Sequence, residues 1–497
     1  MIINYTMDEC SACEACKVIC PTSAITMTEN EKGFAYPYID DSLCIECGRC
    51  EAVCPLNDKN INKLSPKIYA FRKRDSIKLA DSQSGGAFSA FAEIILKSGG
   101  TVYGVALEEF IPKYMRVDKP EDLGKLKGSK YVEAITGDIF LEVNKDLKAG
   151  KQVLFSGSPC HTEGLHHFIK NNKNRDNLIT CDLICHGVPG RLPYFTYLEY
   201  LFRNRGKVSE FNFRDKSLGG WHEHAESFVI RGNKEFSRDY TNLFYLNTAL
   251  RDSCYKCRYA CEKRASDITI GDFWGVERNY PEKDDNKGLS VVMLRSVKAE
   301  KIFEEIIKED EAWKLTLEEC IQPNLKHPTP KPELTDNFWE DIKVHDFDYI
   351  LRNYSDVRYG LNIKREIVMG WSKLNDRGYV VTDYFKERGL LNIALAGDKE
   401  SIIRVLSEIR GKMEMGEDTA NAVSILDVYG LQDENDESFL GLPVINERNI
   451  TDEALAPIDC VLVTDEVNSS DIMTRLTGFG IGMEYVYPLS FILSEEE

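Results

Sequence analysis

The sequence predicts three consecutive units: a small α+β domain, a mixed α/β domain and a small Rossmann-like α/β domain. Eight of the sixteen cysteines lie before residue 55, in two short runs of the same spacing. From about residue 67 to 330, strand-like segments alternate with segments that have the period of a helix. A second strand–helix alternation begins after Leu390. A chain of 497 residues is also too long for a single core.

The eight N-terminal cysteines form two copies of the run C-x-x-C-x-x-C-x-x-x-C-P. In two-cluster bacterial ferredoxins the fourth cysteine of each run ligates the other cluster. We therefore predict a ferredoxin-like dicluster domain over residues 1–58, in which the segment "SAITMTENEKGFAYPYID" forms a hairpin. One predicted 4Fe–4S cluster takes Cys10, Cys13, Cys16 and Cys54, and the other takes Cys44, Cys47, Cys50 and Cys20. Two complete copies of the run disfavour structural zinc, the alternative for four thiolates.

The bulk composition excludes some classes of protein. The formal net charge of -19 argues against a nucleic-acid partner and suits a redox partner with a basic docking patch. No apolar run is long enough to span a bilayer, and no leader precedes the first domain, so we expect a cytoplasmic protein. In a reducing compartment, clustered cysteines are more often metal ligands than disulfides. A homo-oligomer is compatible with this composition.

The central domain places its candidate binding loops after buried strands, where α/β proteins bind ligands. "TVYGVAL", "KQVLFSG" and "NLITCDLIC" have the composition of strands, and "SGGAFSAFAEIILKSGG" that of a Gly turn and an amphipathic helix. Ser84-Gly85-Gly86 opens that helix and could hold a phosphate, although a plain Gly-rich helix start is the commoner interpretation. The loop of Ser129 and Lys130 offers a hydroxyl and a cation, or is a surface turn.

A second group of cysteines indicates a third cluster. Cys160 and Cys185 each follow the end of a predicted strand, and Cys254-x-x-Cys257 would complete a set of four thiolates. Cys261 is a rival for one position, because C-x-x-C-x-x-x-C could supply three ligands itself. Zinc or a redox-active dithiol is the alternative for this set. The remaining cysteines, Cys181, Cys320 and Cys460, are expected to be buried thiols. His222 and His224 are expected to be a pair with satisfied hydrogen bonds on one strand rather than metal ligands.

Several short motifs occur in the order expected of one family. They are "SQSGGAFSAF", "KGSKYVEA", "FSGSPCHTEGL", "DLICHGVPG" and "CYKCRYACEKRASDITIGDFWG". Over residues 67–330 the chain thus resembles the coenzyme F420 hydrogenase/dehydrogenase beta-subunit family. The resemblance implies a non-covalent FAD beside one 4Fe–4S cluster held by Cys160, Cys185, Cys254 and Cys257. Cys261 matches no ligand expected from the family.

The same resemblance implies which residues bind the flavin. The Gly-Gly helix start, the Gly-Ser-Lys-Tyr loop and the ends of two strands supply the candidates Ser84, Gly85, Gly86, Ser129, Lys130, Gly157 and Asp272. Asp267 and Gly271 share the "SDITIGD" motif with Asp272, where a structural role at the sheet end is the alternative. No catalytic residue is indicated. Family members occur in organisms without the deazaflavin coenzyme, so the resemblance leaves a deazaflavin, a nicotinamide or another small molecule open as substrate.

The last third of the chain has two parts. Residues 331–388 are polar with scattered aromatics and are expected to form helical connectors. Residues 389–497 are expected to form the Rossmann-like domain, but the G-x-G-x-x-G frame that starts at Gly397 has Lys399 and Ile402 where glycines belong. Side chains there would block a pyrophosphate, so a docking or oligomerisation domain is favoured.

These features support one main hypothesis and two alternatives. In the first, an iron–sulfur flavoprotein oxidoreductase passes single electrons from a ferredoxin-type carrier through 4Fe–4S clusters to FAD and on to a two-electron acceptor, or the reverse. In the second, the chain is an electron-transfer or docking subunit of a larger redox complex, without its own substrate. A zinc-stabilised interaction protein is the third.

Overall fold

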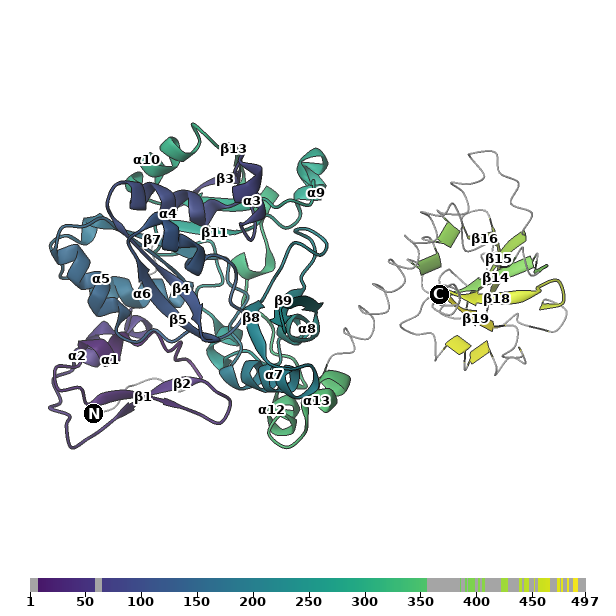
Figure 1. The fold of residues 1–497 in the computed structure, drawn as a ribbon, viewed down its shortest axis with the longest axis horizontal. Coiled ribbons are helices and arrows are strands. Elements are labelled where there is room, and N and C mark those ends of the chain that lie inside the picture. The colour runs from purple at the N-terminus through teal and green to yellow at the C-terminus, as the bar shows by residue number, and fades with distance from the viewer. Residues whose placement is uncertain are drawn as a thin grey trace. The chain divides into compact units, whose positions relative to one another are not determined.

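The fold is described from a computed structural model, which places the chain in two compact units, residues 1–355 and 356–497. In the first unit the structure describes residues 8–58 and 65–354. In the second it describes residues 385, 389–390, 392–397, 401–402, 405–406, 422–427, 438–439, 442–446, 451, 455–464, 472–473, 475–476, 481 and 486–489. Figure 1 shows both units, with elements labelled by their order along the chain where there is room.

The N-terminal domain is a two-stranded hairpin with two short helices. Strands β1 (Ile25–Glu29) and β2 (Ala35–Ile39) pair antiparallel, as the alternation of the segment predicted. Helices α1 (Ala15–Ile19) and α2 (Arg49–Val53) each contain the third cysteine of one run, and they pack against each other. The hairpin therefore joins two pseudo-equivalent loop–helix segments.

An eight-stranded mixed sheet forms the centre of the first unit, in the order β13-β3-β12-β11-β7-β6-β4-β5. Strands β4, β6, β7 and β11 are parallel, and the strands outside them pair antiparallel. The strands are β3 (Lys67–Arg72), β4 (Thr101–Glu108), β5 (Ile111–Val117), β6 (Val153–Gly157), β7 (Leu178–Leu183), β11 (Ile268–Asp272), β12 (Ser290–Leu294) and β13 (Glu311–Leu315). The segments predicted as strands are β4, β6 and β7, and the ends of β6, β7 and β11 meet at one edge of the sheet.

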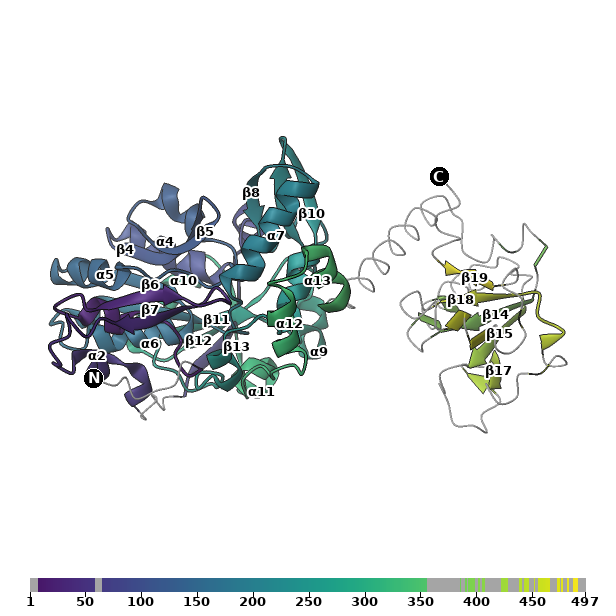
Figure 2. The same cartoon turned by 90° about the horizontal axis from the view of Figure 1, so that it is seen from below.

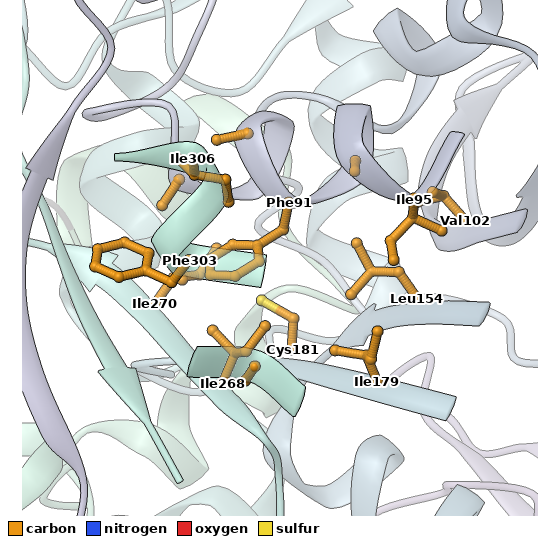
Figure 3. Packing of buried hydrophobic residues seen from close by; sticks show 14 of the residues in the cluster. Phe91, Ile95, Val102, Leu154, Ile179, Cys181, Ile268, Ile270, Phe303 and Ile306 are labelled. Atoms are coloured by element: carbon orange, nitrogen blue, oxygen red, sulfur yellow. The ribbon is translucent and has the colours of Figure 1, made fainter. Parts of the chain in front are cut away.

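Helices cover both faces of this sheet (Figures 1 and 2). Helices α4 (Ala87–Lys97) and α10 (Val297–Ile306) cover one face, and α5 (Ile139–Lys148) and α6 (Pro159–Phe168) cover the other. Alternate residues of a strand point to opposite faces, so Leu154 packs toward α4 and Phe155 toward α5 and α6. Figure 3 shows the α4 side of this core, with the buried Cys181 thiol among its aliphatic and aromatic side chains. The shorter helices of this part are α3 (Ser76–Ala80), α9 (Val276–Asn279) and α11 (Leu317–Cys320).

A smaller antiparallel sheet extends the first unit. Its strands β8 (Val208–Asn212), β9 (Glu226–Ile230) and β10 (Asn233–Ser237) have the order β10-β9-β8. Four helices share an aromatic core with it: α7 (Arg191–Asn204), α8 (Asp239–Tyr245), α12 (Thr335–Asp341) and α13 (Phe347–Tyr354). The start of the expected connector is thus packed on this core, and Trp339 of α12 meets Phe34 of the N-terminal hairpin. Residues 355–384 of that connector lie outside the described residues.

The N-terminal domain is joined to the central sheet by buried polar contacts. The fully buried guanidinium of Arg251 donates to Cys10 O (3.2 Å) and Ala35 O (3.0 Å), pairs with the Glu133 carboxylate and stacks on Tyr36 (4.5 Å to the ring centroid). Glu133 in turn accepts a hydrogen bond from Ala35 N (3.2 Å). On the other side, α1 and α2 pack on α5 and α6 (Figure 1). These contacts place the cysteine loops against the sheet edge.

The second unit contains a largely parallel sheet in the order β16-β17-β15-β14-β18-β19. The strands are β14 (Asn392–Ala396), β15 (Ala422–Asp427), β16 (Ser438–Phe439), β17 (Leu442–Asn446), β18 (Cys460–Val463) and β19 (Val486–Pro488). The chain starts at the central strand β14 and adds parallel strands on both sides, with only β16 antiparallel. Ile402 is buried, Cys460 is a buried thiol as expected, and Lys399 lies outside the described residues.

Among the described residues, no helix is both long enough and apolar enough to cross a bilayer.

We expect that Arg251→Met loosens the N-terminal domain. The substitution leaves the buried Glu133 carboxylate with only the longer ion-pair contact to Arg191 Nε (3.9 Å), and breaking a buried pair costs about 3–5 kcal/mol of folding free energy. The melting temperature of anaerobically purified protein should fall clearly. Arg278→Met is the matched control, because Arg278 is 80% exposed and its contact with Glu277 is long, at 3.7 Å. An Arg251→Met protein that melts with the wild type would contradict this role.

Candidate functional site

The two N-terminal cysteine runs form two separate cages. One small cavity is lined by Cys10, Cys13, Cys16 and Cys54, and a second by Cys20, Cys44, Cys47 and Cys50. These are the two sets that the fourth-cysteine rule predicts, with Cys54 and Cys20 exchanged between the runs. Burial, together with the neighbouring thiols of Cys10, Cys54 and also Cys50, raises the pKa of the Cys16 thiol to about 12. The two cages therefore adjoin each other.

Both N-terminal cysteine loops contain residues with a left-handed backbone conformation. Ala12 (φ 51°) and Glu46 (φ 52°) occupy equivalent positions, as do Glu14 (φ 61°) and Gly48 (φ 69°). A left-handed conformation costs a residue with a Cβ roughly 1–2 kcal/mol. Each turn brings the next cysteine back toward the same point, so this strain serves the convergence of three thiols within seven residues.

The four cysteines predicted for a third set converge although they come from distant segments. Cys160 lies in the first turn of α6 after β6, Cys185 follows β7, and Cys254 belongs to a 3-10 helix, Asp252–Lys256, that Cys257 follows. Burial and then the adjacent Cys160 and Cys257 thiols raise the pKa of Cys185 to about 12. Cys261 is turned away, because its thiol donates to the carbonyl oxygens of Arg258 (3.6 Å) and Lys263 (3.1 Å).

Helix α6 connects the third set to the nearer N-terminal cage. Cys160 lies in its first turn, and Gly164, about 6 Å further along the axis, faces Cys13. A Cβ on Gly164 would come within 2.8 Å of Cys13 Sγ, so only glycine permits this approach. Tyr259, two residues after Cys257, lines the cavity of the same N-terminal cage. The three cysteine sets therefore lie in series, and the set with the exposed Cys47 is the outermost.

A cavity of about 740 Å³ lies beside the third set, at the carboxyl ends of the parallel strands. Cys185 and Ser158 lie in its wall, and Ser158 Oγ is 3.2 Å from Cys160 Sγ. Six of the seven residues predicted to bind flavin line it: Ser84, Gly86, Ser129, Lys130, Gly157 and Asp272. A volume of this size is typical of sites for cofactors and drug-sized ligands.

Three of the residues singled out in the sequence, Gly85, Asp272 and Asp267, have packing or hydrogen-bond roles within the protein. Gly85 lies behind the wall, where a Cβ would meet Phe71 O at 2.1 Å, so it permits the approach of the helix start to β3 and β12. The Asp272 carboxylate is already engaged, because it accepts hydrogen bonds from Arg214 Nη1 and Trp221 Nε1 at 2.7 Å each. Asp267 lies at the other end of β11 and accepts from Thr180 N (2.9 Å). Asp267 thus has the structural role named as the alternative.

Gly157 and Gly271 both permit close packing at the strand ends. A Cβ on Gly157 would lie 2.3 Å from the Tyr114 hydroxyl oxygen, and one on Gly271 would lie 2.7 Å from Ile184 Cδ1. Tyr114 stacks on Phe155 with a centroid distance of 5.2 Å and lines the cavity. No motif marked Tyr114, because its place between the third set and the cavity depends on the pairing of β5 with β4.

The expectation of a histidine pair on one strand is wrong. His222 and His224 precede β9 in an irregular segment and have different partners. His222 Nε2 lies 2.6 Å from Asp284 Oδ1, whereas His224 Nδ1 contacts the Tyr245 hydroxyl. His224 lines the large cavity together with Trp274 and Tyr245, and burial lowers its pKa to about 3. The backbone leaves the strand here because Trp221 N bonds Asn286 O (2.8 Å) instead of a neighbouring strand.

The donor sets fit iron–sulfur clusters. All twelve predicted ligands are cysteines, and cysteine sulfur is the ligand that Fe–S clusters use. Several of these thiols have raised pKa values because they are buried near one another, so bound iron is needed to keep them as thiolates. The cavity also fits a flavin, because its wall contains the buried His161 Nε2 and Gln83 Nε2 atoms, which have no hydrogen-bond partner among the described residues.

Comparisons with known proteins agree with the two cysteine-rich regions. Residues 9–57 match the 4Fe-4S dicluster domain, and residues 150–319 match the family described as coenzyme F420 hydrogenase/dehydrogenase, C terminus of the beta subunit. These two matches confirm the predicted dicluster domain and the predicted resemblance to the F420 hydrogenase/dehydrogenase beta-subunit family.

Individual relatives cover parts of the chain. One subunit of the F(420)H(2) dehydrogenase of Methanosarcina mazei is 24% identical over 193 residues, which are 36% of this chain and 53% of the relative. The chain thus spans about half the length of this relative. Ferredoxin 7Fe of Hydrogenibacillus schlegelii is 36% identical over 67 residues, 13% of this chain and 80% of the ferredoxin. A chain in the structure of the F420-reducing [NiFe] hydrogenase complex from Methanosarcina barkeri has 14% identity and a TM-score of 0.37, covering 61% of this chain and 95% of that chain.

Replacing single cysteines tests the third set. We expect Cys254→Ser to lower the iron content of anaerobically purified protein from about twelve to about eight atoms per chain, because one four-iron cluster loses a ligand. Cys261→Ser is the matched control and should leave iron unchanged. Equal iron in wild type and Cys254→Ser, or loss of iron only in Cys261→Ser, would contradict the assignment.

Proposed function

Because the chain joins a 4Fe–4S dicluster domain to a region of the coenzyme F420 hydrogenase/dehydrogenase beta-subunit family, we propose that it is an iron–sulfur flavoprotein oxidoreductase. It would pass single electrons between a redox partner and a two-electron acceptor or donor, in either direction. The observation that carries the proposal is the serial arrangement of three cysteine sets that ends at a cavity of about 740 Å³.

The chain's own residues hold the proposed cofactors in this series. The two N-terminal cages and the set of Cys160, Cys185, Cys254 and Cys257 would each hold one 4Fe–4S cluster. FAD, when bound, can collect electrons singly and deliver them as a hydride. Ser84, Gly86, Ser129, Lys130 and Gly157 would hold it, with Gly85 and Asp272 supporting the wall. Burial of the third set keeps water away from the centres nearest the cavity.

The second hypothesis, an electron-transfer or docking subunit without a substrate, predicts a flavin face closed by protein. In the enzyme hypothesis, a substrate would approach the flavin from the part of the cavity lined by His224, Tyr245 and Trp274. We infer that the second unit is a Rossmann-like docking or oligomerisation domain, supported by its outward-growing parallel sheet. Clustered cysteines are typical of proteins in a reducing compartment, which supports a cytoplasmic location.

The outermost cage offers a surface for a redox partner. Cys47 is exposed, and exposed apolar side chains of Tyr38, Leu43 and Ile45 lie in the same domain. Acidic side chains accompany them at Asp40, Asp41, Glu46 and Glu51. An apolar patch with an acidic rim fits a one-electron carrier protein with a basic rim, as the net charge of -19 led us to expect.

The cofactor content tests the proposal directly. Protein purified without oxygen should contain about twelve irons and one releasable FAD per chain, because three four-iron clusters and one flavin are proposed. Iron, sulfide and flavin are quantified on one sample, alongside its absorbance spectrum. About eight irons and no flavin would contradict the flavoprotein proposal and favour the electron-transfer subunit.

Charge reversal tests the docking surface. We expect the double variant Asp41→Lys and Glu46→Lys to reduce cytochrome c, a basic one-electron acceptor, about tenfold more slowly than wild type at low ionic strength, because favourable steering is lost. The difference should shrink in high salt. Glu304→Lys with Glu309→Lys is the matched control, because both residues are exposed and lie in α10 or just after it. Equal slowing by the two double variants would refute a specific surface.

A further inference from the structure

A second cavity, of about 640 Å³, adjoins the first, and the two share the wall formed by Ser82, Gln83 and residues 127–130. None of the predicted site residues except Ser129 and Lys130 lines it. Its other walls come from α3, from residues 211–217 at and after the end of β8, and from the loop of Asn286 and Lys287. This second cavity has no role in the cluster series.

The charge in the second cavity is opposite to that of the whole chain. Arg214 and six lysines line it, against the two carboxylates of Asp81 and Asp215, in a chain with a net charge of -19. Carboxylates outside the lining pair with Arg214, Lys125 and Lys287. The lysines are Lys125, Lys127, Lys130, Lys216, Lys234 and Lys287. Such a cation excess in a concave site attracts and concentrates anions.

Two of these lysines have no carboxylate partner in the described part of the chain. Lys216 Nζ donates to Leu79 O (3.0 Å) and Lys287 O (2.9 Å), and Lys130 Nζ donates to Lys127 O (2.7 Å) and Gly128 O (3.2 Å). Lys127 pairs with Asp81 and Lys234 with Asp215, so both carboxylates of the cavity are already engaged. Burial lowers the pKa of Lys216 and of Lys130 to about 8 each, which marks both ammonium groups as incompletely compensated.

Two further donors in the same walls lack partners. Gln83 Nε2 and Arg214 Nε are buried and make no hydrogen bond within the described residues. A buried N–H without an acceptor costs about 1–3 kcal/mol, so a ligand that supplies oxygen acceptors would remove this penalty. The groups without a full complement in these walls are therefore donors or cations, and an anion with oxygen acceptors would satisfy both kinds.

We propose that the second cavity binds the phosphate or diphosphate group of the small molecule that exchanges electrons in the first cavity. This inference rests on the proposed function, because it names the substrate class of that oxidoreductase. A phosphate ester carries a charge of about -1.5 to -2, so it compensates more of the cation excess than one carboxylate does. The two cavities adjoin at Gln83 and Lys130, so the proposal places the phosphate group beside the first cavity.

Direct binding of inorganic pyrophosphate tests the site. Equilibrium dialysis of the anaerobic holoprotein against radiolabelled pyrophosphate at low ionic strength should show saturable binding. Lys216→Met should weaken it about tenfold or more, the loss expected for one charge-assisted hydrogen bond. Lys216→Arg should retain most of the affinity. Lys308→Met is the charge control, because Lys308 is 64% exposed and pairs with the neighbouring Glu305.

Flavin and iron, measured on the same samples, separate this inference from the function on which it rests. Pyrophosphate binding that depends on Lys216 in a protein without flavin would support the anion site while refuting the flavoprotein proposal. No binding by wild type, or equal binding by Lys216→Met, would overturn the anion site. Loss of flavin from Lys216→Met, with no binding by wild type, would overturn it by assigning the cavity to the diphosphate of FAD itself.

Discussion

The buried ion pair of Arg251 and Glu133 is the interaction on which the order of the cysteine sets depends. Arg251 holds the carbonyl of Cys10 in the N-terminal domain, and it lies three residues before Cys254 of the third set. One residue thus positions both the loop of Cys10 in the inner N-terminal set and the segment of Cys254 in the third set. A buried pair adds little net stability, because desolvation offsets its attraction. Its value here is geometric, since neither charge can leave the site without a large penalty.

The backbone around the clusters also gives up stability for geometry. The left-handed residues of the two N-terminal loops accept local strain so that three thiols converge. The third set takes Cys160 and Cys185 from beyond two strand ends and Cys254 and Cys257 from a 3-10 helix and the residue after it. Gly164 then removes a side chain where α6 would otherwise hold Cys13 away. Close approach between the sets therefore comes from a rigid sheet and one missing Cβ. A mobile segment is not needed.

Electrostatics divide the first unit into regions with different partners. The outer cage lies among acidic side chains that suit a basic protein, whereas the second cavity collects lysines that suit a phosphate. Between them, burial raises the pKa values of Cys16 and Cys185, which shows how unfavourable free thiolates would be at these positions. Metal binding in these sets and folding of the unit are consequently expected to depend on each other.

The sequence by itself determined the local features. The C-x-x-C-x-x-C-x-x-x-C-P spacing identified both N-terminal sets, and strand periodicity located β4, β6 and β7, because spacing and period are properties of neighbouring residues. The third set needed the family resemblance to exclude Cys261. Only the tertiary structure decided that Asp272 is held by Arg214, that His222 and His224 part, and that distant lysines meet in one cavity. Those contacts depend on how helices and loops pack across the sheet, which no local pattern encodes.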